Sequence, residues 1–174
     1  MKITISGSLG NTGKVLTRQL VAAGHQVTVI SHNNERKSAI EALGAKAAIG
    51  SVNNAEFLTK AFEGADAVFA MTPPALGGSN IVANITEAGK AFARAFKQAG
   101  TPRVVMLSSI GADLPDGNGP IKAVHNIEKI YSEVKDTAFI FLRAGYYYTN
   151  FYGSVPVIKG MGIIGGNFPA DMKL

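Results

Sequence analysis

Residues Met1–Gly13 read MKITISGSLGNTG, and this stretch decides the predicted fold. A short apolar run ends at Gly7, two further glycines follow at three-residue intervals, Gly10 and Gly13, and a helical pattern begins at Lys14. A strand that feeds a helix through G-x-x-G-x-x-G is typical of a dinucleotide site. An ordinary glycine-rich turn without a ligand is the alternative interpretation.

Each glycine of this turn has its own role in the predicted site. Gly7 allows a tight turn, Gly10 lets the backbone approach a pyrophosphate, and Gly13 lets the new helix pack closely on the strand. The unpaired N–H groups and the positive dipole end of that helix would face the phosphates. We therefore predict cofactor contacts from seven consecutive residues: Gly7, Ser8, Leu9, Gly10, Asn11, Thr12 and Gly13.

The composition predicts one folded domain that binds a small ligand. The 174 residues are 47% apolar and 17% charged, which is enough to build a core. Without cysteine and with dispersed histidines, no metal site is expected. The net charge of +5 comes from scattered residues, which favours a small anion over nucleic acid. No apolar run approaches membrane-spanning length, so we expect a cytoplasmic protein without membrane contact.

Short apolar strands alternate with helices along the chain, which predicts βαβ units and a parallel sheet. After the opening strand, the expected strands are 26–30, 46–49, 67–70, 103–107 and 138–142. The expected helices are 11–23, capped by Asn11 or Thr12, then 35–43, 55–62, 80–99 and 121–134. Beyond Asn150 the many glycines predict irregular structure. The predicted fold class is α/β, a three-layer, doubly wound parallel sheet.

The end of the second predicted strand indicates which dinucleotide fits. An NAD site usually places an acid there to bind the ribose 2′-hydroxyl. This chain has no acid at the strand end; Ser31 and Asn33 can donate hydrogen bonds, while His32, Arg36 and Lys37 can supply positive charge to a 2′-phosphate. We therefore predict NADP, with NAD as the alternative. A solvated first helical turn is the other interpretation of the two basic residues.

The ends of the third and fourth strands supply further predicted contacts. Many enzymes of this architecture have an Asp that holds the adenine amino group at the place of Ser51, which can donate or accept but is a weaker partner. The fourth strand brings Met71, Thr72 and Pro73 to the edge of the sheet where the cofactor would lie. A merely rigid loop is the alternative for the proline segment.

Three stretches, in order along the chain, carry a family resemblance: GSLGNTG at 7–13, VVMLSSIGA at 104–112 and FLRAGYYYTNF at 141–151. They resemble the NmrA-like group of atypical short-chain dehydrogenases/reductases. The resemblance implies a Rossmann fold with strand order 3-2-1-4-5-6 that binds NAD(P). The group includes quinone and azo-dye reductases, ether reductases, and non-catalytic redox sensors that bind transcription regulators.

The same resemblance implies a catalytic set. In active short-chain reductases a Ser, a Tyr and a Lys four residues after the Tyr act together. Here Ser108 or Ser109 fills the serine place, and His125 stands where the Tyr is expected, four residues before Lys129. A neutral His can exchange a proton near pH 7, and Lys129 could also hold the nicotinamide ribose. The implied set is Ser108, His125 and Lys129, with a packing role for His125 as the alternative.

Members of this family usually continue into a small substrate-binding lobe. We therefore expect an NAD(P)-binding domain over 1–152 and the irregular start of a largely missing substrate lobe over 153–174. An apolar face left exposed by the missing lobe would favour a homodimer or another partner.

Three functions follow as hypotheses. The first is an NADPH-dependent reductase that passes hydride to a quinone-like or other small electrophilic substrate. The second is a non-catalytic NAD(P)-binding redox sensor, which the missing Tyr favours. The third, a relative of sugar-nucleotide epimerases, has the least support because the Tyr-x-x-x-Lys pattern is absent.

Overall fold

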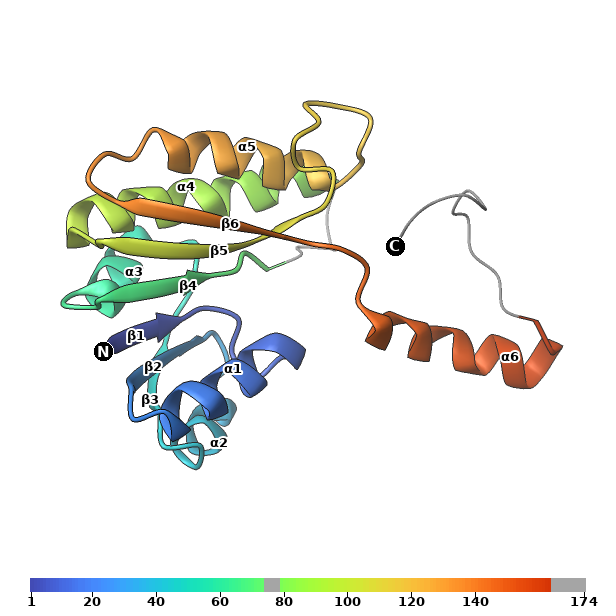
Figure 1. Ribbon diagram of the computed structural model, residues 1–174, viewed down its shortest axis with the longest axis horizontal. Helices are drawn as coiled ribbons and strands as arrows, with labels where there is room; N and C mark the ends of the chain where they lie inside the picture. Colours follow the sequence, from blue (N-terminus) through green and yellow to red (C-terminus); the bar gives the residue numbers. More distant parts are fainter. Residues whose placement is uncertain (74–78, 164–174) are drawn as a thin grey trace. The chain divides into compact units, whose positions relative to one another are not determined.

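The computed structural model describes residues 1–73 and 79–163, and its six strands form one sheet in the order β3-β2-β1-β4-β5-β6 (Figure 1). The strands are β1 (Lys2–Ile5), β2 (Gln26–Ser31), β3 (Lys46–Ile49), β4 (Ala67–Ala70), β5 (Arg103–Ser109) and β6 (Ala138–Ala144). The α-helices are α1 (Asn11–Ala22), α2 (Lys37–Glu41), α3 (Ala55–Phe62), α4 (Ile81–Ala99), α5 (Ile121–Ser132) and α6 (Val155–Met161). Two 3₁₀ helices are η1 (Asn34–Arg36) and η2 (Tyr148–Ser154).

The sheet has the predicted Rossmann order. The chain starts in the middle at β1, moves outward through β2 to β3, then returns to place β4, β5 and β6 on the other side of β1. The pairings of β1 with β2 and β4, of β2 with β3, and of β4 with β5 are parallel. The strand order therefore reverses between β1 and β4. In open sheets of this kind, ligands bind beside the carboxyl ends of the strands at the point where the order reverses.

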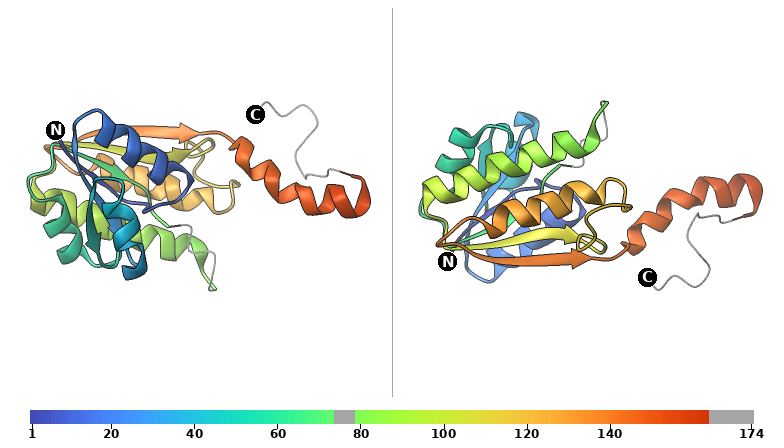
Figure 2. Two further views of the ribbon diagram at one scale, coloured as in Figure 1. Left: turned by 90° about the horizontal axis from the view of Figure 1, so that it is seen from below. Right: turned by 90° about the horizontal axis from the view of Figure 1, so that it is seen from above.

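Helices flank the sheet on both of its faces (Figure 2), and an apolar core on each face holds the layers together. On one face, α1 and α2 pack on residues such as Ile5 and Val29. On the other face, α3, α4 and α5 cover a larger core that contains Phe62, Phe92 and Phe96, whose rings contact one another. The alternation of inward and outward residues along β5 fits a strand with one deeply buried face.

Two expected elements differ from the structure. The helix predicted at 35–43 is a 3₁₀ turn followed by the short α2, because the side chain of Asn33 accepts a hydrogen bond from Glu35 N and tightens the first turn. The prediction of irregular structure beyond Asn150 is wrong for η2 and α6. Pro156 lies in the first turn of α6, where no backbone donor is needed, and Gly162 ends the helix in a left-handed conformation.

The chain forms two compact units, 1–143 and 144–174. The first contains helices α1–α5 and almost the whole sheet, and the second contains η2 and α6. The predicted boundary after residue 152 and the assignment of 153–174 to a substrate lobe stay predictions. Residues 164–174, part of that expected lobe, lie outside the described residues.

The turn after β1 requires two of its glycines for different reasons. Gly7 has φ of +111°, and a Cβ there would lie 2.1 Å from the terminal methyl of Met71. A Cβ on Gly13 would lie 2.2 Å from the carbonyl oxygen of Ser8, which is a backbone atom and cannot swing aside. Helix α1 is thus closer to the turn than any residue with a side chain would allow.

Replacing Gly13→Ala should lower the free energy of unfolding by about 2–4 kcal/mol, because the new methyl overlaps a backbone oxygen. Urea denaturation followed by circular dichroism measures the change. Gly145→Ala is the matched control: its Cβ would meet nothing within 4 Å, so its midpoint should stay close to that of the parent. A Gly13→Ala protein as stable as the parent would contradict the close approach.

Candidate functional site

The strands β1 and β4 are held together by a serine at the point where the sheet reverses. Ser6, fully buried, accepts a hydrogen bond from Met71 N (2.6 Å) and donates one to Met71 O (3.0 Å) through its Oγ. The side chain therefore ties the start of the loop after β1 to the start of the loop after β4. This fixes the place where both loops leave the carboxyl edge of the sheet.

A groove of about 440 Å³ opens at this edge. Its lining comes from the loops that follow β1, β2, β3 and β4: Gly7, Ser8, Ile30, Ser31, His32, Arg36, Ser51, Val52, Asn53, Met71 and Pro73. Residues predicted from four separate stretches of sequence thus meet in one concavity. Of the described residues that line it, none is acidic.

Not every predicted cofactor residue lines this groove. The residues outside its lining are Leu9, Gly10, Asn11, Thr12, Gly13, Asn33, Thr72 and Lys129. Residues 9–13 are the continuation of the turn into the first turn of α1, directly after the lining residues of the turn. Lys129 lies on α5 and lines another groove.

The start of α1 leaves hydrogen-bond donors without side-chain acceptors. The predicted cap, Asn11 or Thr12, is wrong: the helix begins at Asn11, its N-cap is Gly10, and no side chain caps it. Its first turn contains no acid. Because the first N–H groups of a helix have no intrahelical partner, this end suits an anion.

Ser8 supplies the clearest sign of a missing partner. The residue is only 7% exposed, and its hydroxyl has no hydrogen-bond partner among the described residues. Its φ of +51° is uncommon for a residue with a side chain. A buried hydroxyl without a partner costs about 1–3 kcal/mol, which a ligand oxygen in the groove would offset. The residues present therefore fit a phosphate-bearing ligand.

The residues after β2 divide into two groups. Ser31 Oγ accepts from Asn33 N and donates to Asn33 O, both at 3.2 Å, so these two residues bond each other and shape the turn. His32 and Arg36 are exposed and line the groove. Within the described part of the chain Arg36 forms no ion pair, so its guanidinium is available to a ligand.

The predicted catalytic serine is engaged in a network that sequence reasoning missed. Ser108, buried at the end of β5, donates a hydrogen bond to Glu128 Oε1 at 2.5 Å. Arg143 of β6 donates to both oxygens of the same carboxylate, from Nε at 3.1 Å and from Nη2 at 2.7 Å. The network joins β5, α5 and β6 and uses the only proton that Ser108 can donate.

Glu128 remains ionised within this network. Burial acts to raise its pKa, but the hydrogen bonds from Arg143 and Ser108 and the positive charge of Arg143 outweigh burial, so the pKa of Glu128 lies below its ordinary value of 4.5. A signal for this residue exists in the sequence: Glu128 sits beside Ile127 and near Tyr131 on the inward face of α5. A carboxylate on such a face requires a partner.

His125 and Lys129 lie on the same side of α5. His125 Nδ1 contacts Ala112 O at 2.7 Å; because a carbonyl only accepts, Nδ1 carries the proton. Both residues line a groove of about 600 Å³ together with Glu128 and Arg143. Ser108 is linked to this group only through Glu128, and Ser109 Oγ donates to Ile110 O. His125 and Lys129 thus share a groove with Glu128, whose carboxylate accepts from Ser108.

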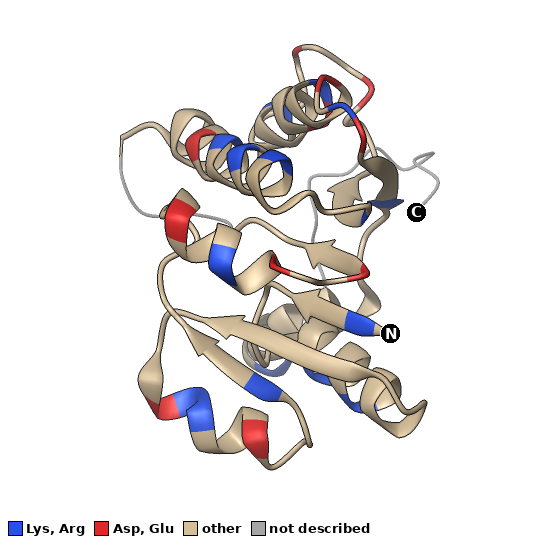
Figure 3. Cartoon of the chain, turned by 90° about the vertical axis from the view of Figure 1, so that its left-hand side faces the viewer, with Lys and Arg blue, Asp and Glu red and all other residues tan. Residues whose placement is uncertain are grey.

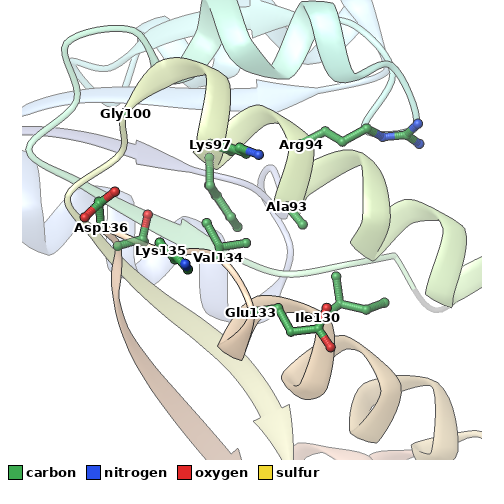
Figure 4. A pocket seen from close by; sticks show the side chains of 11 residues that line it. Ala93, Arg94, Lys97, Gly100, Ile130, Glu133, Val134, Lys135 and Asp136 are labelled. Carbon is green, nitrogen blue, oxygen red and sulfur yellow. The ribbon is translucent and has the colours of Figure 1, made fainter.

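A different concavity, of about 700 Å³, lies at the C-terminal ends of α4 and α5 (Figure 4). Its lining includes Gly100, just before β5, and Thr137, just before β6. It therefore lies at the amino edge of the sheet, away from the glycine turn, and it contains none of the predicted site residues.

Charged residues are spread over many elements, with Lys and Arg as well as Asp and Glu on several of them (Figure 3). Among the described residues, no helix is both long and apolar enough to cross a bilayer. In the same ranges, no three His, Cys, Asp or Glu side chains are grouped as metal ligands would be.

The fold and the groove at its carboxyl edge define a Rossmann-type domain of the NAD(P)-binding class. A family model described as NAD(P)H-binding matches residues 7–149, and the chain belongs to that family. The resemblance to NmrA-like short-chain reductases is confirmed at this level. No curated protein matches the chain in sequence.

Several solved structures share the fold at low sequence identity. An NADPH-dependent quinone oxidoreductase from Escherichia coli, in complex with NADPH, has a TM-score of 0.79 and 21% identity over 92% of this chain and 54% of its own. A triphenylmethane reductase from Citrobacter sp., in complex with NADP(H), has a TM-score of 0.78 and 20% identity over 91% of this chain and 55% of its own. A nucleoside-diphosphate-sugar epimerase from Staphylococcus aureus has a TM-score of 0.79 and 16% identity over 92% of this chain and 56% of its own. The chain spans about half the length of these proteins.

Replacing Glu128→Gln should destabilise the protein by about 1–3 kcal/mol at pH 7, because a charged, hydrogen-bonded carboxylate is lost from a site where its side chain is 9% exposed. A lowered pKa stabilises the fold above pH 4.5, and this contribution disappears as the pH falls through the pKa of the folded protein. The difference between parent and variant, measured by urea denaturation, should therefore narrow below pH 4.5.

Glu133→Gln, at an exposed acid near the end of the same helix, is the control and should leave the urea midpoint unchanged. If the free energies of unfolding of the parent and of Glu128→Gln differ by the same amount at pH 7 and at pH 3, the network does not depend on the charge of Glu128.

Proposed function

We propose that this chain is the cofactor-binding part of an NADPH-dependent oxidoreductase whose acceptor is a quinone-like or other small electrophilic molecule. The observation that carries the proposal is the groove at the β1–β4 reversal, where, among residues 1–73 and 79–163, the buried hydroxyl of Ser8 has no hydrogen-bond partner and Arg36 forms no ion pair. Membership of the NAD(P)H-binding family supports the cofactor class. The names of two structural neighbours, both reductases with NADPH or NADP(H) bound, support the reaction class.

In this proposal the turn and the start of α1 hold the pyrophosphate. Ser8 Oγ donates to a phosphate oxygen, and the first N–H groups of α1 face the same charge. Gly10 leaves this approach open, since a Cβ there would meet nothing nearer than Gly7 O at 3.4 Å. The bound cofactor supplies the hydride chemistry, and the chain supplies position and electrostatics.

Arg36 is the residue proposed to select NADPH. A guanidinium binds a phosphate through two parallel hydrogen bonds, which a ribose hydroxyl cannot match in charge. Ser31 and Asn33 support this role indirectly, because their mutual hydrogen bonds set the turn that leads into η1 and Arg36.

The groove lined by His125, Lys129 and Glu128 is the proposed place of proton exchange. With Nδ1 bonded to Ala112 O, His125 presents Nε2 as its remaining ring nitrogen, and Lys129 lies on the same groove. Ser108 acts through Glu128 rather than on the acceptor, since its proton is already donated. For an acceptor that can take its last proton from water, this arrangement is sufficient.

One observation favours a second candidate, a non-catalytic NAD(P)-binding sensor. The hydroxyl of Ser108 is committed to Glu128, and no tyrosine occupies the place of His125. A protein of this kind would need the groove at the β1–β4 reversal, and it would not need the groove lined by His125 and Lys129.

Replacing Arg36→Ala should weaken NADPH binding roughly tenfold and leave NADH binding within about twofold, because only NADPH carries the 2′-phosphate. Fluorescence titration with each reduced cofactor measures both constants. Lys37→Ala removes the same charge from the next residue, which does not line the groove, and should affect the two cofactors equally. Tighter binding of NADH than of NADPH by the parent would refute the selectivity.

Oxidation of NADPH by the purified chain, followed at 340 nm with a panel of quinones, separates the two candidate functions. Turnover that saturates with quinone is the expected result. Tight NADPH binding without turnover on any acceptor, in a full-length version of the protein, would favour the sensor, and absence of binding would refute both.

A further inference from the structure

The base subsite of the groove is defined by the order of the strands, and this step rests on the proposed function. In the proposed function the turn after β1 holds the pyrophosphate, and Arg36, which follows β2, holds the ribose phosphate. The next strand outward is β3, so the base of the same nucleotide reaches the loop after β3. The groove is lined there by Ser51, Val52 and Asn53.

This part of the groove offers an apolar surface and two neutral polar side chains. Ile30 is buried and Val52 is half-buried, so they can cover one face of a flat base. Ser51 and Asn53 are exposed on the rim, and no acid is among the described lining residues. A base edge therefore meets a hydroxyl and an amide, each of which both donates and accepts.

The hydroxyl of Ser51 is held in place while its proton stays free. Ser51 Oγ accepts a hydrogen bond from Asn53 N at 3.2 Å, and Asn54 N donates to Ser51 O at 3.1 Å, so the turn fixes the residue. Among the described residues, no acceptor takes the Ser51 hydroxyl proton. The oxygen keeps one further lone pair, so Ser51 can serve a donor or an acceptor on the base.

We propose that Ser51 makes the base subsite tolerant at the 6-position of the purine, so that the groove binds hypoxanthine dinucleotides about as well as adenine dinucleotides. Adenine presents an amino donor at this position, and hypoxanthine presents a carbonyl acceptor. A carboxylate at residue 51 accepts from the amino group and repels the carbonyl. A serine satisfies either group, so the chain lacks the element that would reject the 6-oxo base.

The test compares two reduced cofactors, NADPH and reduced nicotinamide hypoxanthine dinucleotide phosphate, which differ at the 6-position and at the adjacent N1, an acceptor in adenine and an N–H donor in hypoxanthine. Both fluoresce through the same nicotinamide, so one titration measures each dissociation constant without any acceptor. In the parent protein the two constants should agree within about threefold. In Ser51→Asp the dissociation constant of NADPH should be about tenfold or more below that of the hypoxanthine analogue. The added carboxylate accepts a charged hydrogen bond from the adenine amino group and repels the hypoxanthine carbonyl.

Ser51→Asp preserves the turn, because a carboxylate can also accept from Asn53 N. The control is Asn54→Asp, which adds the same charge nearby but outside the groove lining. Asn54 caps α3 by accepting from Phe57 N, a role that Asp performs equally well. In Asn54→Asp the two dissociation constants should stay within about threefold of each other. This control separates a hydrogen bond made by residue 51 from a general effect of added negative charge.

Each outcome decides a different point. A parent that binds NADPH at least ten times more tightly than the hypoxanthine analogue overturns the tolerance. A tolerant parent whose ratio does not change in Ser51→Asp overturns the assignment to Ser51. Failure of both nucleotides to bind refutes the proposed cofactor function itself, and the inference with it.

Discussion

The contact between Gly13 and the carbonyl of Ser8 is the constraint on which the rest of the site depends. It brings α1 against the turn after β1, so the uncapped N-terminus of the helix packs on the turn that contains the buried hydroxyl of Ser8. Ser6 then ties this turn to the loop after β4. The close approach that only glycine allows at residue 13 therefore helps to fix the loops after β1 and β4 at the carboxyl edge of the sheet.

A second constraint acts on the other half of the sheet. The carboxylate of Glu128 joins β5, α5 and β6 through Ser108 and Arg143. The cost of burying one charge is offset by three hydrogen bonds, which is why a network of this kind can persist in an interior. The same network takes up the hydroxyl proton of Ser108, and His125 and Lys129 line a groove together with Glu128.

The parallel α/β sheet and the NAD(P)-binding class could be predicted from the residues, because both depend on local rules, whereas the strand order was implied by the family resemblance. Glycine spacing and apolar alternation are visible in single stretches of chain. The cap of α1 was missed because Asn11 and Thr12 are good caps elsewhere, whereas the structure starts the helix one residue earlier, after Gly10.

What could not be predicted depends on contacts between distant residues. Ser108, Glu128 and Arg143 belong to three elements, and nothing in any one of them indicates that they meet. In the same way, Ser31 and Asn33 have the composition of ligand contacts, yet their polar groups bond each other. Helix α6 was missed because its glycines and proline suggest a loop, although each lies where a helix tolerates it.

The uncapped start of α1 couples the stability of the fold to the solution around it. In most helices a side chain of the protein itself accepts the first N–H groups, and the fold carries that stabilisation permanently. Among the described residues no side chain accepts at this end, and the hydroxyl of Ser8 is a second buried group without a partner. An anion that bound here would bind the folded state and not the unfolded one, so its concentration would set how far the folded state is favoured.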